Sequence, residues 1–187
     1  TVLDPVCLSR TFLGEGITAM YCAPSLLRQL IDEMPSALRA LDVLIIGGEI
    51  FRTQDAFNAQ RLVKGSVLNC YGNTENTGYT AIYRISRRDA IVNNVPIGRT
   101  ISNSGVLVLD PRQQVVPLGV MGEIVLIGDG VARGYTDASL DHGRFQHIEV
   151  NESRVKAYRT GDRGRYRPRD AQLEFFGRMD YQVKIRG

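Results

Sequence analysis

The sequence predicts an α/β fold, in which a parallel sheet flanked by helices is followed by a small antiparallel, β-barrel-like subdomain. Up to about Asn103, short apolar runs alternate with helix-like segments, as they do in layered α/β units. Beyond Asn103, strands follow one another between Pro, Gly and Asp turns, and helical periodicity is scarce. We therefore expect residues 1–102 to form the α/β part and residues 103–178 the β-rich part.

The first part shows helices and strands in alternation. Residues 24–34 predict a helix with Pro24 near its start, and one face of this helix carries Leu26, Leu27, Leu30 and Ile31. Residues 43–46 are an apolar run that ends in two glycines, which is typical of a buried parallel strand. Thr53 is expected to cap a helix of about ten residues, and residues 66–70 predict the next strand.

The second part contains four predicted strands, at residues 105–110, 122–128, 158–160 and 172–176. Segments rich in Pro, Gly and Asp separate them, as expected for turns between strands. These features predict a small antiparallel barrel or a distorted sheet.

The composition excludes several classes of protein. The chain has 187 residues, of which 43% are hydrophobic and 23% charged, and its formal net charge is +3. These are ordinary globular values, and the small, dispersed basic excess favours a solvated surface over a nucleic-acid interface. No stretch reaches the roughly 20 apolar residues of a membrane span. We therefore expect neither nucleic acid nor membrane as a partner.

The cysteines and the first residue bear on the setting of the chain. The three cysteines, Cys7, Cys22 and Cys70, are odd in number and form no CxxC pair, which argues against a disulfide framework or a zinc site. A reducing, cytoplasmic location is the expected one. The chain opens at Thr1 without a signal peptide or an initiating Met, so we expect it to be an excised piece of a longer protein.

The first informative motif is NCYGNTE, residues 69–75, which follows a predicted strand. Ligands of open α/β sheets bind at the carboxyl ends of strands. Gly72 would let the backbone turn close to a ligand, and Tyr71 offers a flat face for a purine. Thr74 offers a hydroxyl for a phosphate oxygen, and Glu75 a hard oxygen ligand for Mg²⁺. A simple turn capped by Thr74 is the alternative.

The second motif, residues 122–135, reads GEIVLIG followed by DGVARGY and places glycines around Arg133. Glycine loops can cradle phosphates, but this loop follows a strand in a β-rich region and lacks the Lys-Ser/Thr of a P-loop. A tight structural turn is therefore favoured over direct phosphate contact.

Two further motifs are YRTGD, residues 158–162, and GRMDYQVKIRG, residues 177–187. At the end of a strand, Asp162 can accept hydrogen bonds from both hydroxyls of a ribose, a device that dinucleotide-binding folds use. A plain Gly-Asp turn is the alternative. The last motif is basic with apolar alternation, and taken alone it would be read as a solvated edge strand.

In this order, the four segments resemble the core motifs of the adenylate-forming, or AMP-binding, superfamily. More narrowly, they resemble the adenylation domains of nonribosomal peptide synthetases, which carry NxYGPTE, GELxIxGxGxARGY, YRTGD and GRxDxQVKIRG. The last motif distinguishes peptide synthetases from acyl-CoA synthetases. The resemblance covers essentially the whole chain, since residues 44–49 and 96–99 also fit the connecting stretches.

The resemblance implies a nucleotide site with assigned roles. In the family, the motif tyrosine stacks on adenine, the threonine meets the α-phosphate and the glutamate holds Mg²⁺, which implies Tyr71, Thr74 and Glu75 here. The aspartate of TGD binds the ribose, and the arginine of GRxD approaches ribose or phosphate, which implies Asp162 and Arg178. The other positions expected at the nucleotide are Gly48, Glu49, Asn69, Cys70, Gly72 and Phe175.

The end of the chain would contain the hinge of such a domain. The resemblance implies that Asp180 is the residue about which a small C-terminal subdomain swings, so that residues 179–187 are the hinge and the start of that subdomain. Lys184 would lie near the nucleotide in one domain orientation and share the catalytic role with Thr74 and Glu75.

The resemblance also implies an amino-acid pocket. Its expected lining is Tyr21, Ile45, Gly47, Cys70, Gly78 and Tyr79. The two glycines would leave room for a sizeable side chain, and buried tyrosine hydroxyls usually find hydrogen-bond partners. A medium or large, not purely aliphatic amino acid is expected, with phenylalanine-sized acids and modified ornithines as candidates. The alternative for each residue is that it belongs to the core.

The implied activity is amino-acid activation. The substrate carboxylate attacks the α-phosphate of ATP with the help of Mg²⁺, pyrophosphate leaves, and the acyl group of the adenylate passes to a phosphopantetheine thiol. The implied partners are the carrier (thiolation) and condensation domains of the same synthetase.

Departures from the family pattern leave alternatives open. Asn73 replaces the motif proline, and we expect the site to survive because asparagine tolerates turn geometry. The phosphate loop and the aspartate for the substrate amino group would lie upstream, and the C-terminal catalytic lysine beyond Gly187. The chain alone is therefore expected to show only background ATP–pyrophosphate exchange. An acyl-CoA or aryl-acid ligase, and a non-catalytic nucleotide- or substrate-binding module, are the competing interpretations.

Overall fold

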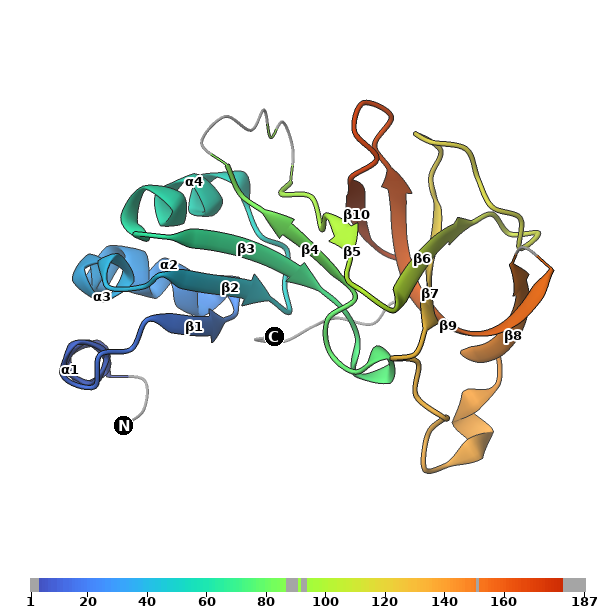
Figure 1. Cartoon of the computed structure of the whole chain (residues 1–187), viewed down its shortest axis with the longest axis horizontal. Coiled ribbons are helices and arrows are strands. Elements are labelled where there is room, and N and C mark those ends of the chain that lie inside the picture. Colours follow the sequence, from blue (N-terminus) through green and yellow to red (C-terminus); the bar gives the residue numbers. More distant parts are fainter. Residues whose placement is uncertain (1–3, 87–90, 92–93, 151, 180–187) are drawn as a thin grey trace. The chain divides into compact units, whose positions relative to one another are not determined.

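The computed structural model describes residues 4–86, 91, 94–150 and 152–179 and divides the chain into two compact units (Figure 1). The first unit contains the described residues up to Cys70 and those within Tyr83–Val95. The second unit contains Tyr71–Ile82 and the described residues from Pro96 onward. The change of sequence pattern near residue 103 falls inside the second unit; as a domain boundary it stays a prediction.

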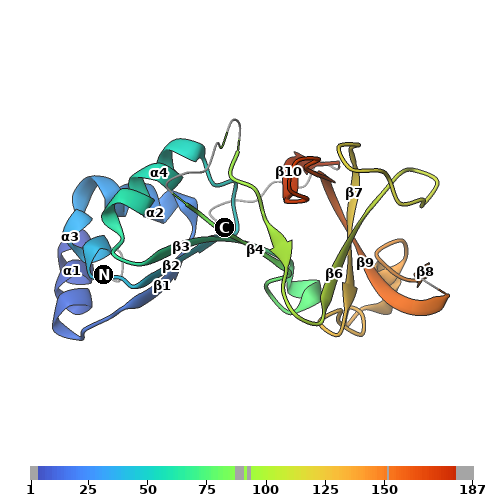
Figure 2. The ribbon, with the colours of Figure 1, turned by 45° about the horizontal axis from the view of Figure 1, so that its top comes forward.

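The first unit is a parallel sheet with helices. Strand β1 pairs with β2, and β2 with β3, both in parallel, with Tyr21 opposite Ile45 and Gly47 opposite Cys70. Figure 2 shows the helices together on one side of these strands. The elements are α1 (Pro5–Gly14), β1 (Ala19–Cys22), α2 (Pro24–Glu33), α3 (Pro35–Arg39), β2 (Val43–Gly47), α4 (Thr53–Leu62) and β3 (Ser66–Tyr71).

The core of the first unit follows from strand alternation and helix amphipathicity. On β2, Leu44 and Ile46 are fully buried, whereas Ile45, which points to the opposite face, is only half-buried. Leu27 of α2 and Ala56 of α4 join the same apolar cluster and are also fully buried. The apolar stripe predicted for residues 24–34 therefore packs on one face of the sheet.

The prediction that Thr53 caps the second long helix is wrong. The N-cap residue of α4 is Arg52, whose extended backbone (φ −73°, ψ 143°) precedes the first helical residue, Thr53. A bridge between Arg52 and Asn94 holds the preceding backbone in this extended form. The helix consequently starts one residue earlier than it would with Thr53 as its cap, and Arg52 makes no side-chain cap bond.

The second unit is dominated by an antiparallel sheet with the order β10-β9-β7-β6, and β8 pairs with β9. Strand β4 passes from this unit into the first, and its residues Ala81 and Ile82 pair with β5. The elements are η1 (Thr74–Asn76), β4 (Ala81–Arg84), β5 (Arg99–Thr100), β6 (Ser104–Leu109), β7 (Gly122–Gly128), η2 (Ala138–Asp141), β8 (Phe145–Val150), β9 (Ser153–Tyr166) and β10 (Leu173–Arg178).

The predicted fold class is confirmed, with two adjustments. Among the described residues, β10 and β6 remain separate ends of the antiparallel sheet, so it is not a closed barrel. The strand predicted at residues 158–160 is in fact 14 residues long, Ser153–Tyr166. Gly161, which suggested a turn, instead sits inside the strand with a φ of 72°, at a register shift against β7.

Two further observations bear on the setting. In the described part of the chain, no helix is long and apolar enough to cross a bilayer. All three cysteines are free thiols; Cys7 is exposed, and Cys22 and Cys70 are buried.

Candidate functional site

Three of the predicted site residues meet in the second unit. Tyr71 ends β3, Asp162 lies within β9 and Arg178 ends β10. The Tyr71 hydroxyl donates a hydrogen bond to Asp162 Oδ2 at 2.5 Å, and Arg178 Nη1 donates to Asp162 Oδ1 at 3.0 Å. Asp162 is 1% exposed and Tyr71 8%. Motifs separated by 91 residues in sequence therefore converge on one buried carboxylate.

The chemistry around Asp162 is well defined. Burial raises the pKa of Tyr71 well above its ordinary value, and the negative charge of Asp162 raises it further. Tyr71 thus stays protonated and acts as a donor. The ring of Phe175 on β10 lies with its centroid 6.2 Å from that of Tyr71, tilted by 38°. A carboxylate, an arginine and two aromatic rings therefore lie together in this unit.

A second cluster surrounds Glu75. The Tyr135 hydroxyl donates to Glu75 Oε1 at 2.6 Å, and the hydroxyl oxygens of Tyr135 and Tyr158 are 3.3 Å apart. Burial pushes the pKa of Glu75 upward, but the hydrogen bonds from Tyr135 and Tyr158 and the charge of Arg144 outweigh it, and the pKa ends below its usual value. Burial and the neighbouring Glu75 raise the pKa values of both tyrosines. Glu75 is therefore an ionised carboxylate with tyrosine hydroxyls as partners.

The glycine-rich segment at residues 128–135 lies against the turn that carries Glu75. Ala132 N–H donates to the Glu75 carbonyl at 2.8 Å, and the Thr77 hydroxyl donates to the Gly130 carbonyl at 2.8 Å. Tyr135, at the end of the segment, contacts the Glu75 side chain as described above. These contacts favour the structural interpretation of the segment over a phosphate cradle.

The turn between Tyr71 and Gly78 is tightly built. Thr74 begins the single turn of η1 and is exposed, and its N-cap, Asn73, makes no side-chain cap bond. A Cβ on Gly72 would lie 1.8 Å from the Gly78 carbonyl oxygen, so only glycine fits there. The predicted role of Gly72 beside a ligand stays a prediction, since the close approach seen is to protein backbone. The Oδ1 atoms of Asn73 and Asn76 are buried without a hydrogen-bond partner in the described structure.

Four residues predicted for the amino-acid pocket belong to the first unit. Tyr21 and Ile45 are register partners on β1 and β2. A Cβ on Gly47 would lie 3.0 Å from the Cys70 carbonyl oxygen and 3.4 Å from Tyr21 Cε2. Tyr21, Gly47 and Cys70 are therefore close neighbours, and the lack of a side chain at Gly47 permits this close approach. Burial raises the pKa of the Cys70 thiol to about 11.

The remaining predicted residues have other surroundings. The Asn69 side chain donates to the Val95 carbonyl at 3.5 Å in the buried interior of the first unit, and Glu49 Oε1 accepts from the Ser25 hydroxyl at 3.3 Å. Gly48, beside Glu49, has a φ of 90°. In the second unit, Gly78 is exposed and Tyr79 half-buried. The predicted hinge and catalytic residues, Asp180 and Lys184, lie outside the described residues.

Sequence reasoning missed the tyrosine partners of Glu75. Tyr135 and Tyr158 belong to the motifs ARGY and YRTGD, but the motif pattern alone assigns neither tyrosine a role. Their contacts with Glu75 span 60 residues or more, so only the pairing of the strands reveals them. Among the described residues, no group of three or more His, Cys, Asp and Glu side chains gathers as a metal site would require.

The sequence has clear similarities to known proteins. Residues 1–136 match the family described as AMP-binding enzyme. The whole chain is 54% identical to nonribosomal peptide synthetase kk1B of Curvularia clavata, covering 1% of that protein, and 54% identical to PF 1022-synthetase of Rosellinia sp., covering 6% of it. One similar solved structure is that of holo-PA1221, an NRPS protein containing adenylation and PCP domains, bound to a vinylsulfonamide inhibitor. The match covers 98% of this chain and 32% of the PA1221 chain, with 34% sequence identity and a TM-score of 0.91. The chain thus spans only a small part of these relatives.

Proposed function

Because this chain belongs to the AMP-binding enzyme family, we propose that it forms the nucleotide-binding part of an adenylation domain in a nonribosomal peptide synthetase. The observation that carries the proposal is the convergence of Tyr71 and Arg178 on the buried carboxylate of Asp162. Separate motifs supply an aromatic ring, a carboxylate and a cation, which are the groups needed for a base, a ribose and a phosphate. The names of the relatives support the narrower assignment to peptide synthetases.

The residues present fit an adenosine nucleotide. The rings of Tyr71 and Phe175 offer apolar faces to a purine, and Asp162 offers oxygens to the ribose hydroxyls. Because Asp162 is only 1% exposed, a ribose must take the place of some of the contacts that now cover its carboxylate. Arg178 would then be close enough to the nucleotide to meet a phosphate oxygen.

Glu75 is the residue that would hold Mg²⁺. Its ionised carboxylate is the type of oxygen ligand that this ion prefers, and the neighbouring Thr74 hydroxyl is exposed and would meet a phosphate oxygen. Bound Mg²⁺ usually takes only one or two carboxylates and completes its shell with water and substrate phosphates, so a lone glutamate is compatible with it. When present, the ion would neutralise phosphate charge.

The proposed reaction is transfer of an adenylyl group to an amino acid. An oxygen of the substrate carboxylate bonds to the α-phosphorus of ATP, the bond to the bridging oxygen breaks, and pyrophosphate leaves with that bond's electron pair. The contribution of this chain is to position the nucleotide and to stabilise its charge. The phosphopantetheine thiol of a carrier domain would then take the acyl group as a thioester, with loss of its proton and release of AMP, and a condensation domain would use the product. Free thiols support a reducing, cytoplasmic setting.

The substrate side of the proposal rests on the first unit. The absence of a side chain at Gly47, next to Tyr21 and Cys70, favours a medium or large substrate side chain, and the exposed Tyr21 favours one that is not purely aliphatic. Gly78 and Tyr79, in the second unit, stay predictions of the sequence. An acyl-CoA or aryl-acid ligase is the second candidate, since it belongs to the same superfamily.

The test uses the intact parent protein. We expect it to bind AMP in isothermal titration calorimetry, and we expect Asp162→Ala to weaken that binding at least tenfold. A carrier-protein thiol, and not CoA, is the expected acyl acceptor in a thioester assay. AMP binding that is indifferent to Asp162 would contradict the nucleotide site, and transfer to CoA alone would favour the second candidate.

A further inference from the structure

Glu123, at the start of β7, is a buried acid outside the residues assigned to the nucleotide. Its side chain is 8% exposed. Oε2 accepts hydrogen bonds from Nε and Nη2 of Arg159 at 2.9 and 2.5 Å, and Oε1 accepts one from the backbone N–H of Gly161 at 3.1 Å. One carboxylate therefore binds both a neighbouring guanidinium and the backbone immediately before Asp162.

The backbone at Gly161 departs from the regular ladder. Strand β7 pairs its Glu123 with Arg163 of β9, and its Val125 with Arg159 of β9. Between these two pairs, β9 has three residues where β7 has one. Gly161 lies in this extra stretch with a φ of 72°. Bulges of this kind re-aim a side chain, and their displaced N–H groups need other acceptors. Glu123 supplies that acceptor for Gly161.

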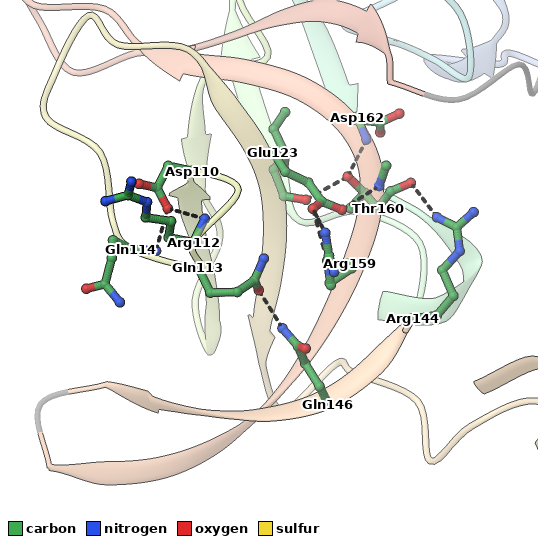
Figure 3. Close-up of polar contacts among 12 residues, drawn as sticks. Asp110, Arg112, Gln113, Gln114, Glu123, Arg144, Gln146, Arg159, Thr160 and Asp162 are labelled. Atoms are coloured by element: carbon green, nitrogen blue, oxygen red, sulfur yellow. Dashed lines mark hydrogen bonds and ion pairs between the residues drawn. The ribbon is translucent and has the colours of Figure 1, made fainter. Parts of the chain in front are cut away.

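Thr160 makes two further hydrogen bonds at the bulge. Its hydroxyl donates to the Ile124 carbonyl at 2.7 Å and accepts from the Asp162 N–H at 2.9 Å. Figure 3 shows Glu123, Arg159, Thr160 and Asp162 gathered at this point of the sheet. Thr160 is fully buried, so water does not compete for these hydrogen bonds.

We infer that Glu123 is a positioning residue, which acts through the Gly161 bulge to aim the Asp162 carboxylate at the ribose diol of the nucleotide. The inference rests on the proposed function, because it requires Asp162 to meet the ribose. The inference assigns a joint role to Glu123 and to Arg159, the arginine of YRTGD. Arg159 holds the Glu123 carboxylate, and Glu123 holds the backbone that presents Asp162.

The experiment compares two ligands in the intact parent protein. Calorimetry measures the affinities for AMP and for 2′,3′-dideoxy-AMP, which lacks both hydroxyls that Asp162 would bind. We expect Glu123→Gln to weaken AMP binding about tenfold, the lower end of the loss seen when an outer-shell partner is removed from a metal site. Affinity for the dideoxy analogue should stay unchanged. The ratio of the two affinities does not depend on how much of the variant is folded.

A matched control and a second variant sharpen the test. Glu174→Gln removes a comparable ion pair, since Glu174 Oε2 accepts from Arg165 Nε at 2.9 Å between β10 and β9, and it should leave the ratio unchanged. Arg159→Gln should lower the ratio of the affinity for AMP to the affinity for 2′,3′-dideoxy-AMP, as we expect of Glu123→Gln. Equal loss of both ligands in Glu123→Gln, or no loss at all, would overturn the positioning role.

Failure of the proposed function gives a different pattern. Asp162→Ala should abolish the preference for AMP over its dideoxy analogue. If wild-type protein shows no such preference, or if Asp162→Ala retains it, the ribose role of Asp162 is wrong and the inference falls with it. If Asp162→Ala abolishes the preference and Glu123→Gln does not, the nucleotide site stands and only the role of Glu123 is wrong.

Discussion

The two units of this chain bury different kinds of side chain. Among the described residues, Asn69 is the one buried polar residue of the first unit, whose core is otherwise a layer of aliphatic and aromatic groups. The second unit buries Asn76, Thr80, Glu123, Thr160 and Asp162 beside its apolar cluster. Hydrophobic burial is non-directional, whereas buried polar groups need partners at set distances. The comparison suggests that the first unit provides a scaffold and the second provides defined polar geometry.

The largest expected effect is on the polar cluster of the second unit. Asp162→Ala removes the carboxylate that faces Arg178, whose side chain is only 12% exposed. Loss of one partner of a buried ion pair costs about 3–5 kcal/mol. The shift of the urea unfolding midpoint measures the effect. A loss below about 1 kcal/mol would mean that this ion pair is not what orders the second unit.

The corresponding change in the first unit creates a cavity. Leu44 is the second residue of β2 and is fully buried. Leu44→Ala is expected to cost about 3 kcal/mol, because the removed methyl groups leave a space that the neighbours fill only partly. The same urea experiment applies, with Ile45→Val on the half-buried face of the strand as control. Equal costs for the two variants would contradict the assignment of one core face to β2.

A smaller effect is expected from a single hydroxyl. Tyr71→Phe leaves the ring in place but removes the hydrogen bond to Asp162, and bonds to charged groups contribute about 1.5–3 kcal/mol. Tyr166→Phe is the matched control, because the Tyr166 hydroxyl donates to the neutral carbonyl of Val106 at 2.9 Å. Thermal unfolding should show the greater loss for Tyr71→Phe. The reverse order would show that the charge of Asp162 adds nothing to this bond.

The smallest effect is on thiol reactivity and leaves the fold intact. Burial raises the pKa of Cys22 to about 12 and that of Cys70 to about 11, so both remain protonated thiols at pH 8. Only the thiolate reacts with iodoacetamide, so labelling at pH 8 should modify the exposed Cys7 first. Raising the pH should increase the reactivity of the buried pair. Mass spectrometry that finds Cys22 labelled as fast as Cys7 at pH 8 would show that the first unit is not a dry core.

The sequence predicted elements whose signal is local. The strand at residues 122–128 has the predicted bounds, and the helix predicted at 24–34 is found at Pro24–Glu33. Both depend on periodicity within a single segment. Strand β9 was predicted too short because Gly161 suggests a turn, and only the pairing with β7 shows that it is a bulge.

The sequence motifs predicted which residues belong to the site, but not which of them contact one another. The resemblance to a known family indicated Tyr71, Asp162 and Arg178, and the structure brings these three together. The contacts of Glu123 with Gly161 and of Tyr135 with Glu75 cross 38 and 60 residues and depend on strand register. Local residue patterns do not show which strands far apart in sequence pair with one another, so these contacts could not be predicted.

The close approach of Gly72 to Gly78 at the base of the loop limits which sequence changes the loop tolerates. Gly72 has no room for a Cβ, and Gly78 has a φ of 93°, so neither tolerates another side chain readily. The Thr80 N–H also donates to the Tyr71 carbonyl and closes the base of the loop. Of the five residues enclosed, Glu75 and Thr77 are also bound by the segment at residues 128–135. A change in the ligand chemistry of this loop must therefore keep both glycines and preserve the fit to that segment.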